Sequence, residues 1–517
     1  MNTRTILPPR AGVRVALAVG ASVLLVAGCG HRIPDEELLA ANSRVVGETP
    51  AGPTETTGPA AEAAAPTEVP SAGAGSSPVT PGPTGTPAPA SATPTATVGR
   101  SGQRPGPGPS PSPAAGGRVP APVATQPPVP GGQKPAPVGQ AGCATPNETG
   151  PILIGSVGNY SGVVASSMVP FVRPVQAWMQ DINSRGGLCG REVKLIIVDD
   201  KGDPAQHRAA LQDLVEERRV VAFVSNAAVL TSTSGVSYLE SVKVPVLGSS
   251  CSVVAEYKSP LFFLPCPSVA DQFFGAARAA ALFGGESRKW GLVYCREAEV
   301  CTFGHRVLIA EGAAKEAGLE IVHQGQASIV QPDYTSECLS AQRAGADKLF
   351  VIMDLASLGR FVNSCNRQGY NPTYVQLSSS IDASTKDLPG MRLVAATGVF
   401  SFAARATPAE QQFQSVVAKY LGSTTPGPGE AQGWANAKLL EAAVTRAAQA
   451  SASVLPSTLV PALNTFKGET LDGLSVPLTF PAGAPGQAQP CFWVSEGAAG
   501  RPWSVLHNGK MLCRGRD

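Results

Sequence analysis

Cysteine is the residue type with the most evident chemistry in this chain of 517 residues. Ten of the 11 cysteines follow Cys29, and no CxxC pair of the kind found in zinc sites and thioredoxin-like enzymes occurs. In an exported protein, an even set of cysteines indicates disulfides rather than metal ligands. Other connectivities stay open, and the simplest scheme pairs sequential neighbours: Cys143–Cys189, Cys251–Cys266, Cys295–Cys301, Cys338–Cys365 and Cys491–Cys513.

Catalytic chemistry has little support in the sequence. There is no GxSxG elbow, no HExxH helix and no phosphate loop ending in Gly-Lys-Ser/Thr. Asp199 and Asp200 are conspicuous, but we expect them to order their own turn and the helix after Pro204, because calcium would need more oxygen ligands. The sequence therefore predicts a binding module with no catalytic residue, no metal and no cofactor. An enzyme of the cell wall is the least favoured alternative.

The first 29 residues indicate export and a lipid anchor. Arg4, Arg10 and Arg14 precede a short apolar run at 15–28, which is typical of a secretory signal peptide. The run ends in Val26-Ala27-Gly28-Cys29, which resembles the lipobox of bacterial lipoproteins. We therefore expect residues 1–29 to be a lipoprotein signal peptide and Cys29 to carry the lipid. The alternative is an ordinary signal peptide with a chance cysteine. Either way, the rest of the chain is expected on the extracytoplasmic face of the cell membrane.

The chain then changes composition twice. Residues 30–142 are mostly Pro, Ala, Thr, Gly and Ser, and the first aromatic residue in the sequence is Tyr160. Such a segment cannot bury enough apolar surface to offset its ordering entropy, so we predict a disordered stalk. Residues 143–517 are long enough for two lobes of ordinary domain size. A net charge of +2 gives no electrostatic footprint for nucleic acid.

Strands and helices are expected to alternate through most of residues 143–517. Predicted strands lie at 152–157, 193–198, 220–224, 244–247, 261–264, 290–294, 320–323, 349–353 and 373–377. Predicted helices lie between them, including 269–283, 304–317 and 358–367, and three more follow at 408–420, 430–450 and 456–466. This alternation predicts an α/β fold of doubly wound, Rossmann-like parallel sheets, which bind ligands at the carboxyl ends of their strands. Short strands at 478–480, 491–494 and 503–506 predict an antiparallel finish, linked by Cys491 and Cys513.

Several short motifs, in order, make the chain resemble a known family. They are Ile154-Gly155, Ser161-Gly162, Gly186-Gly187-Leu188-Cys189-Gly190-Arg191, Asp199-Asp200-Lys201-Gly202-Asp203-Pro204, Val244-Pro245-Val246-Leu247-Gly248-Ser249-Ser250 and Phe303-Gly304. Together they are similar to the leucine/isoleucine/valine type of periplasmic binding protein, type I, over nearly all of 150–480. The Cys295–Cys301 loop departs from the family pattern, because many members have a shorter, acidic turn there.

The resemblance implies two α/β lobes joined by three crossovers that close over a small ligand. Transferred to this chain, lobe 1 is expected at about 150–265 and 396–475, and lobe 2 at about 266–395 and 476–517. Members of the family deliver amino acids, amides, urea or aromatic acids to a membrane permease. We therefore expect a lipid-anchored, monomeric solute-binding protein of an ABC importer. A ligand-sensing receptor of the same fold, acting on a membrane or cell-wall partner, is the alternative.

The resemblance also implies that loops after the strands hold the ligand. In lobe 1 these loops carry six polar or aromatic candidates, each of which could instead be an ordinary turn or cap: Tyr160, Ser161, Ser225, Asn226, Ser249 and Ser250. In lobe 2 the matching candidates are Thr302, Phe303, Asp354 and Ser379. Asp354 directly follows an apolar strand and could pair with an ammonium group. Its alternative role is the N-cap of the helix after it.

Overall fold

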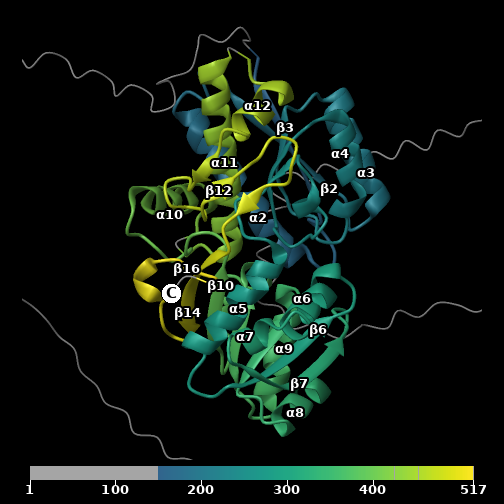
Figure 1. Ribbon diagram of the computed structural model, residues 1–517, viewed down its shortest axis with the longest axis vertical. Coiled ribbons are helices and arrows are strands. Elements are labelled where there is room, and N and C mark those ends of the chain that lie inside the picture. Colours follow the sequence, from purple (N-terminus) through teal and green to yellow (C-terminus); the bar gives the residue numbers. More distant parts are fainter. Residues whose placement is uncertain (1–149, 424, 452, 516–517) are drawn as a thin grey trace, which may run out of the picture. The chain divides into compact units, whose positions relative to one another are not determined.

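The computed structural model describes residues 150–515, apart from residues 424 and 452. Two β-sheets, each with its own helices, form two lobes in this part of the chain (Figure 1). Lipidation at Cys29, the signal peptide at 1–29, the stalk at 30–142 and Cys143 all lie outside the described residues. Among the helices that are described, none combines the length and the apolar character needed to cross a bilayer.

The first lobe is built on a parallel sheet of five strands in the order β2-β1-β3-β4-β5. Its strands are β1 (Ile152–Gly158), β2 (Val193–Asp199), β3 (Ala222–Asn226), β4 (Val246–Ser249) and β5 (Phe262–Phe263). Alternate side chains face opposite sides of the sheet, so Val224 and Leu247 pack in one apolar cluster while Phe223 and Val246 pack in another.

Helices cover both faces of this sheet. One face carries α2 (Ala165–Ser184), α10 (Pro408–Leu421), α11 (Pro428–Ala450) and α12 (Pro456–Leu463), and the other carries α3 (Pro204–Gln212) and α4 (Val236–Val242). Gly433 lets α11 approach α2 closely, since a Cβ there would lie 2.0 Å from the carbonyl oxygen of Phe171. A glycine is therefore required at this contact.

The second lobe is built on a sheet of eight strands, in the order β15-β14-β10-β9-β8-β6-β7 with β16 paired to β14. Its parallel strands are β6 (Lys289–Cys295), β7 (Glu320–Ala327), β8 (Lys348–Ile352), β9 (Thr373–Leu377) and β10 (Arg392–Thr397). The strands β14 (Cys491–Ala498), β15 (Ser504–Val505) and β16 (Leu512–Cys513) complete it in antiparallel pairing, as the sequence predicts.

Five helices accompany this sheet: α5 (Val269–Phe283), α6 (Glu299–Ile309), α7 (Ala313–Glu316), α8 (Thr335–Arg343) and α9 (Leu355–Arg367). The single helix predicted at 304–317 is wrong, because the chain turns at Gly312, whose φ of 81° lies in the left-handed region and separates α6 from α7. Strand β10 is absent from the predicted strands.

The chain passes between the lobes three times: after β5, after β10 and before β14. Between the second and third passages, β11 (Lys467–Glu469), β12 (Leu478–Thr479) and β13 (Gln487–Ala488) form a small sheet of their own. Phe480, next to β12, packs edge-on against Phe263 of the first lobe at 5.1 Å. The described residues thus confirm the predicted fold class, two doubly wound α/β lobes.

Four of the predicted disulfides are present: Cys251–Cys266, Cys295–Cys301, Cys338–Cys365 and Cys491–Cys513. Cys189 is disulfide-bonded as well, and its predicted partner, Cys143, lies outside the described residues. Each of the four pairs joins cysteines separated by 27 positions or fewer.

Candidate functional site

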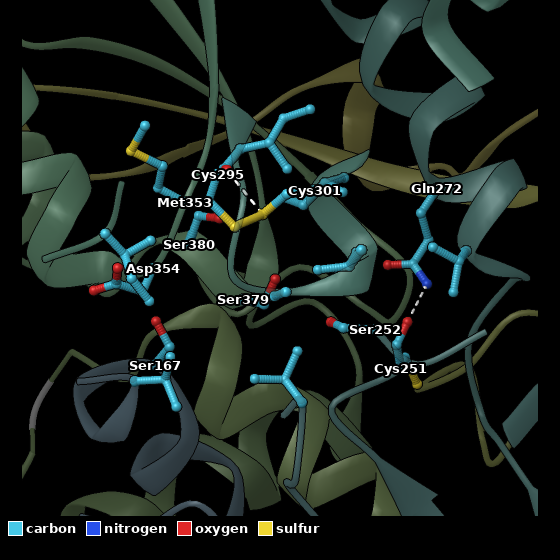
Figure 2. Close-up of a pocket in the computed structure, with 18 of the residues that line it drawn as sticks. Ser167, Cys251, Ser252, Gln272, Cys295, Cys301, Met353, Asp354, Ser379 and Ser380 are labelled. Atoms are coloured by element: carbon cyan, nitrogen blue, oxygen red, sulfur yellow. Dashed lines mark hydrogen bonds between the residues drawn. A yellow bond between two sulfur atoms is a disulfide. The ribbon is translucent and has the colours of Figure 1, made fainter. Parts of the chain in front are cut away.

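A pocket lies between the two lobes, at the carboxyl ends of their strands (Figure 2). We call it the interlobe pocket. The first lobe contributes the start of α2, Val229 and the loop after β4, and the second lobe contributes α5, α6 and the residues that follow β6, β8 and β9. It encloses about 660 Å³ that no protein atom fills, part of it open to solvent. This is the place where doubly wound sheets bind ligands.

Most of the pocket wall is aliphatic or aromatic. The apolar lining residues are Val164, Met168, Val229, Val269, Phe273, Ala298, Val300, Ile329, Phe350, Ile352, Met353 and Leu377. The Cys295–Cys301 disulfide adds two sulfur atoms to the same wall (Figure 2). It joins the end of β6 to the first turn of α6, and so fixes the loop between them. The wall suits an apolar molecule.

One end of the pocket carries a group of polar side chains from both lobes. Ser167 on α2 accepts a hydrogen bond from the backbone N–H of Leu355 at 2.8 Å, which links the two lobes directly. In the close-up, Ser380 lies beside Met353 and Ser379 lies between Asp354 and Ser252, and within the described part of the chain neither hydroxyl has a hydrogen-bond partner (Figure 2). Polar groups with no partner in a largely buried site are ready to bind a ligand.

Asp354 lies at the same end and caps α9. Its carboxylate accepts hydrogen bonds from the backbone N–H of Ser357 at 3.1 Å and from the Ser357 hydroxyl. Burial raises the pKa of the Asp354 carboxyl, although the hydrogen bonds from Ser357 oppose this shift. The cap role expected as the alternative for Asp354 is therefore present, and the side chain also lines the interlobe pocket.

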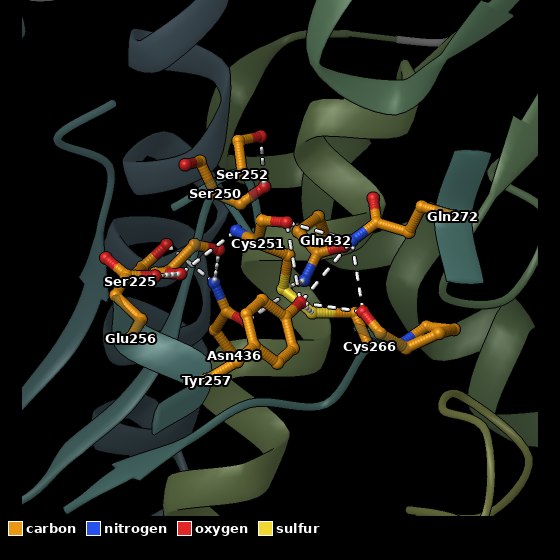
Figure 3. The surroundings of a disulfide bond; sticks show 12 residues. Ser225, Ser250, Cys251, Ser252, Glu256, Tyr257, Cys266, Gln272, Gln432 and Asn436 are labelled. Carbon is orange, nitrogen blue, oxygen red and sulfur yellow. Dashed lines mark hydrogen bonds between the residues drawn. A yellow bond between two sulfur atoms is a disulfide. The ribbon is translucent and has the colours of Figure 1, made fainter. Parts of the chain in front are cut away.

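The opposite end of the pocket contains Gln272 of α5 and the loop after β4. The Gln272 amide donates to the carbonyl oxygen of Cys251 at 2.8 Å and to that of Pro267 at 3.0 Å (Figure 3). Cys251 belongs to the first lobe and Gln272 to the second, so this is another direct link between lobes. Ser252 lines the pocket beside it and donates to the carbonyl oxygen of Ser250.

The Cys251–Cys266 disulfide holds the same loop against the first passage between the lobes (Figure 3). The Tyr257 hydroxyl donates to the carbonyl oxygen of Pro267 at 2.7 Å, and the Gln432 amide contacts the Cys251 sulfur at 3.1 Å. Cys251 has a φ of 58°, an uncommon left-handed conformation for a residue other than glycine. Such backbone strain is held where the surroundings over-determine it, and here a disulfide and several hydrogen bonds do so.

Four predicted site residues lie behind the pocket rather than along it, with their polar groups bonded within the first lobe. Tyr160 contacts the Ser156 hydroxyl at 2.7 Å, and Ser225 donates to the carbonyl oxygen of Phe171 at 2.8 Å and accepts from the Asn436 amide at 2.9 Å. Asn226 accepts from the backbone N–H of Val157 at 3.0 Å, and Ser249 donates to Glu256 at 2.5 Å. These contacts position the strand ends.

The other predicted residues are placed as follows. Ser161 and Thr302 are exposed, and the Thr302 hydroxyl donates within its own helix to the carbonyl oxygen of Glu299. Phe303 is half-buried, with the guanidinium of Arg306 4.6 Å from its ring centre. Ser250 is buried, and its hydroxyl has no partner. Of the ten predicted ligand contacts, the structure brings Asp354 and Ser379 together in the lining of the interlobe pocket.

The paired aspartates order their turn, which confirms the sequence interpretation. Asp199 accepts hydrogen bonds from the backbone N–H groups of Tyr160, Ser161 and Lys201, and Asp200 accepts one from Gly202. Asp203 caps α3. Among the described residues, no group of three or more His, Cys, Asp or Glu side chains is arranged to hold a metal ion.

Sequence reasoning missed Ser167, Ser252 and Gln272. Ser167 lies in the first turn of α2, which begins at Ala165. Gln272 is a polar residue in the first turn of an otherwise largely apolar helix, directly after a passage between the lobes. That position is a signal the sequence does contain.

Known proteins resemble this chain in sequence and in fold. A family profile described as periplasmic binding protein matches residues 151–501. A curated amino acid binding protein from Pseudomonas aeruginosa is 32% identical over 75 residues, which is 14% of this chain and 20% of that relative's length.

Two solved structures share the fold. One is a fatty acid ABC transporter substrate-binding protein from Thermomonospora curvata, with a TM-score of 0.59 and 18% identity over 72% of this chain and 97% of that one. The other is a solute binding protein of an ABC transporter from Rhodopseudomonas palustris BisB5 in complex with 3,4-dihydroxybenzoic acid. Its TM-score is 0.58, with 15% identity over 71% of this chain and 98% of that one.

Proposed function

This chain belongs to the periplasmic binding protein family, and on that premise we propose that it is a lipid-anchored solute-binding protein that delivers a small molecule to an ABC importer. The family's location is extracytoplasmic. Cys29 would carry the anchor, and residues 30–142 would lift the two lobes away from the membrane. An ABC permease in the membrane would receive the ligand. The protein itself makes and breaks no covalent bond in this role.

The observation that carries the proposal is the interlobe pocket with its unused polar groups. The hydroxyls of Ser379 and Ser380 are positioned at one end of a largely apolar pocket, and both lobes form its wall. Burying polar groups without partners costs free energy, so a site of this kind is best explained by a ligand that supplies the missing hydrogen bonds. We propose Asp354, Ser379, Ser380 and Ser167 as its ligand-contacting residues.

Two direct hydrogen bonds between lobes lie on either side of the pocket. They are Leu355 N–H to the Ser167 hydroxyl, 2.8 Å, and the Gln272 amide to the Cys251 carbonyl oxygen, 2.8 Å. Both join the two lobes in the arrangement that the structure has. A ligand that contacts both lobes therefore binds the closed form better than the open form, and it shifts the population toward closure by that difference in affinity.

The proposal is tested by a thermal-shift screen of the full chain and by distance measurements between spin labels on the two lobes. We expect at least one solute among amino acids, amides, nucleosides and aromatic acids to raise the melting temperature, because binding to the native state stabilises it. The same solute should reduce the distance between the lobes, measured by spin labels on exposed positions such as Lys201 and Lys315. A protein that responds to no solute in the screen, and whose lobe distance never changes, would refute the proposed function.

A further inference from the structure

Building on the proposed function, we infer that the interlobe pocket selects uncharged, largely apolar molecules with a hydrogen-bonding group at each end, and that it discriminates against free amino acids and carboxylates. The inference depends on three observations: the composition of the wall, the charges around it, and the polar groups left without partners.

The composition of the wall determines what kind of body the ligand can have. Twelve of the 21 lining residues are apolar, and the sulfur atoms of the Cys295–Cys301 disulfide lie in the same wall. Burial of apolar surface contributes about 25 cal/mol per Å². A ligand with an aliphatic or aromatic body therefore gains affinity along the whole wall, whereas a small polar solute does not.

The charged groups around the pocket determine which charges on a ligand are unfavourable. Among the described residues that line the pocket, none is Lys, Arg or His. Arg360, a cation whose charge acts on Asp354, already donates to the carbonyl oxygens of Gln331 and Ile329. A carboxylate transferred into this pocket would lose its hydration without gaining an ionic partner, which is costly.

Helix N-termini could replace a cation, because their free N–H groups bind anions. At the start of α9, however, the N–H of Leu355 donates to Ser167 and the N–H of Ser357 donates to Asp354. At the start of α2, the N–H of Ala165 donates to the carbonyl oxygen of Gly162, and the N–H groups of Ser167 and Met168 both donate to the carbonyl oxygen of Val164. The N–H groups named here are therefore not free to bind an incoming carboxylate.

An ammonium group is disfavoured for a related reason. Asp354 is the only carboxyl group in the lining, and both of its oxygens accept hydrogen bonds from Ser357. Burial raises the pKa of this carboxyl, so its charged form is less favourable here than in water. Its position as the α9 cap further reduces its capacity to pair with a cation.

The polar groups without partners determine which hydrogen-bonding groups the two ends of the ligand need. The hydroxyls of Ser379 and Ser380 can donate or accept at one end. At the other end, the amide nitrogen of Gln272 is used by Cys251 and Pro267, while its amide oxygen has no partner and can accept. A primary amide or hydroxyl at one end, and a donor at the other, match this arrangement (Figure 2).

Matched probes that differ only in charge test the inference. Calorimetry at pH 7 on the full chain would compare 3-(4-hydroxyphenyl)propanamide, 3-(4-hydroxyphenyl)propanoate and tyrosine, and likewise 5-hydroxypentanamide, 5-hydroxypentanoate and 5-hydroxynorvaline. We expect each amide to bind at least tenfold more tightly than its two charged counterparts. A carboxylate or amino acid that binds as tightly as its amide would overturn the inference, while binding itself would leave the proposed function standing.

Two variants sharpen the result. Ser380→Ala should weaken amide binding by two- to tenfold, whereas Ser378→Ala, in the same turn but outside the pocket lining, should not. Ser379→Lys places a cation at the pocket and should invert the preference toward the carboxylate. Unchanged selectivity in Ser379→Lys would overturn the inference.

If none of the six probes binds, the inference is tested by the charge of any ligand that the thermal-shift screen finds. A neutral ligand supports the inference and a charged one refutes it. No response in that screen refutes the proposed function as well.

Discussion

Replacing Glu256 with glutamine is expected to remove most of one pH-dependent component of stability. The Glu256 carboxylate is fully buried in the first lobe, beneath the loop after β4 that lines the interlobe pocket. It accepts hydrogen bonds from the hydroxyls of Ser232 and Ser249, both at 2.5 Å, and no cation is paired with it in the described part of the chain. Burial raises its pKa to about 7, although the two hydroxyls oppose the shift.

The sign and size of the effect follow from the pKa in the two states. Below pH 4.5, the ordinary value, the folded and unfolded chains both carry the proton and the stabilisation is complete. As pH rises from there to about 7, only the folded chain keeps the proton, so the free energy of unfolding falls by about 1.4 kcal/mol per pH unit. The total loss is about 3 kcal/mol. Above pH 7 this group causes no further change.

Urea denaturation of the full chain between pH 4.5 and 8 measures this effect. Relative to the Glu256→Gln variant, the wild-type protein should lose about 3 kcal/mol of unfolding free energy across that range. Contributions from all other groups cancel in the comparison. Glu320→Gln, at an exposed position, serves as the control and should run parallel to the wild type. Parallel curves for Glu256→Gln and the wild type would show that the carboxyl of Glu256 titrates alike in the two states, and the reasoning would be refuted.

Three further outcomes are expected. Ser167→Ala should weaken ligand binding about two- to tenfold by calorimetry, because it leaves the N–H of Leu355 without its partner in the other lobe. The matched control is Ser166→Ala, which should bind ligand normally because the Ser166 hydroxyl has no partner. Asp354→Ala should lower the unfolding free energy of the ligand-free protein by about 1 kcal/mol, because it removes the cap of α9. Asp354→Asn should change it little, because asparagine is also a good cap. Equal losses of unfolding free energy in the two variants, measured by urea titration, would contradict the cap role. Cys29→Ser should release the protein from membranes or leave it unprocessed in cell fractionation, and membrane association at the unchanged processed mass would argue against the lipid anchor.

The strand and helix pattern could be predicted because most buried segments have a clear period and clear ends. Strand β10 shows the limit. Its core, Leu393-Val394-Ala395-Ala396, is short and contains small residues, and its identity as a strand depends on pairing with β9 on one side and β14 on the other. The β14 partner lies about 100 positions further along the chain. No local pattern reveals such a partner.

The location of the candidate site could be predicted from the sequence better than the side chains that line it. The rule that selects residues just after a strand picked out Asp354 and Ser379, which line the interlobe pocket. The same rule also selected Ser225, whose hydroxyl is instead used by Phe171 and Asn436, 54 and 211 positions away. Whether a serine at a strand end faces a ligand or a neighbouring helix depends on these distant contacts. Sequence order alone does not distinguish the two.

The course of the last strands has a consequence for biosynthesis. Strand β14 lies beside β10 within the sheet of the second lobe, yet it is made only after the chain has returned to the first lobe and built α10, α11 and α12. Until residues 491–498 emerge, β10 presents an unpaired edge, and exposed strand edges recruit other chains. Completion of the second lobe therefore waits for nearly the whole polypeptide. A nascent chain stalled before β14 should be held unfolded or aggregate.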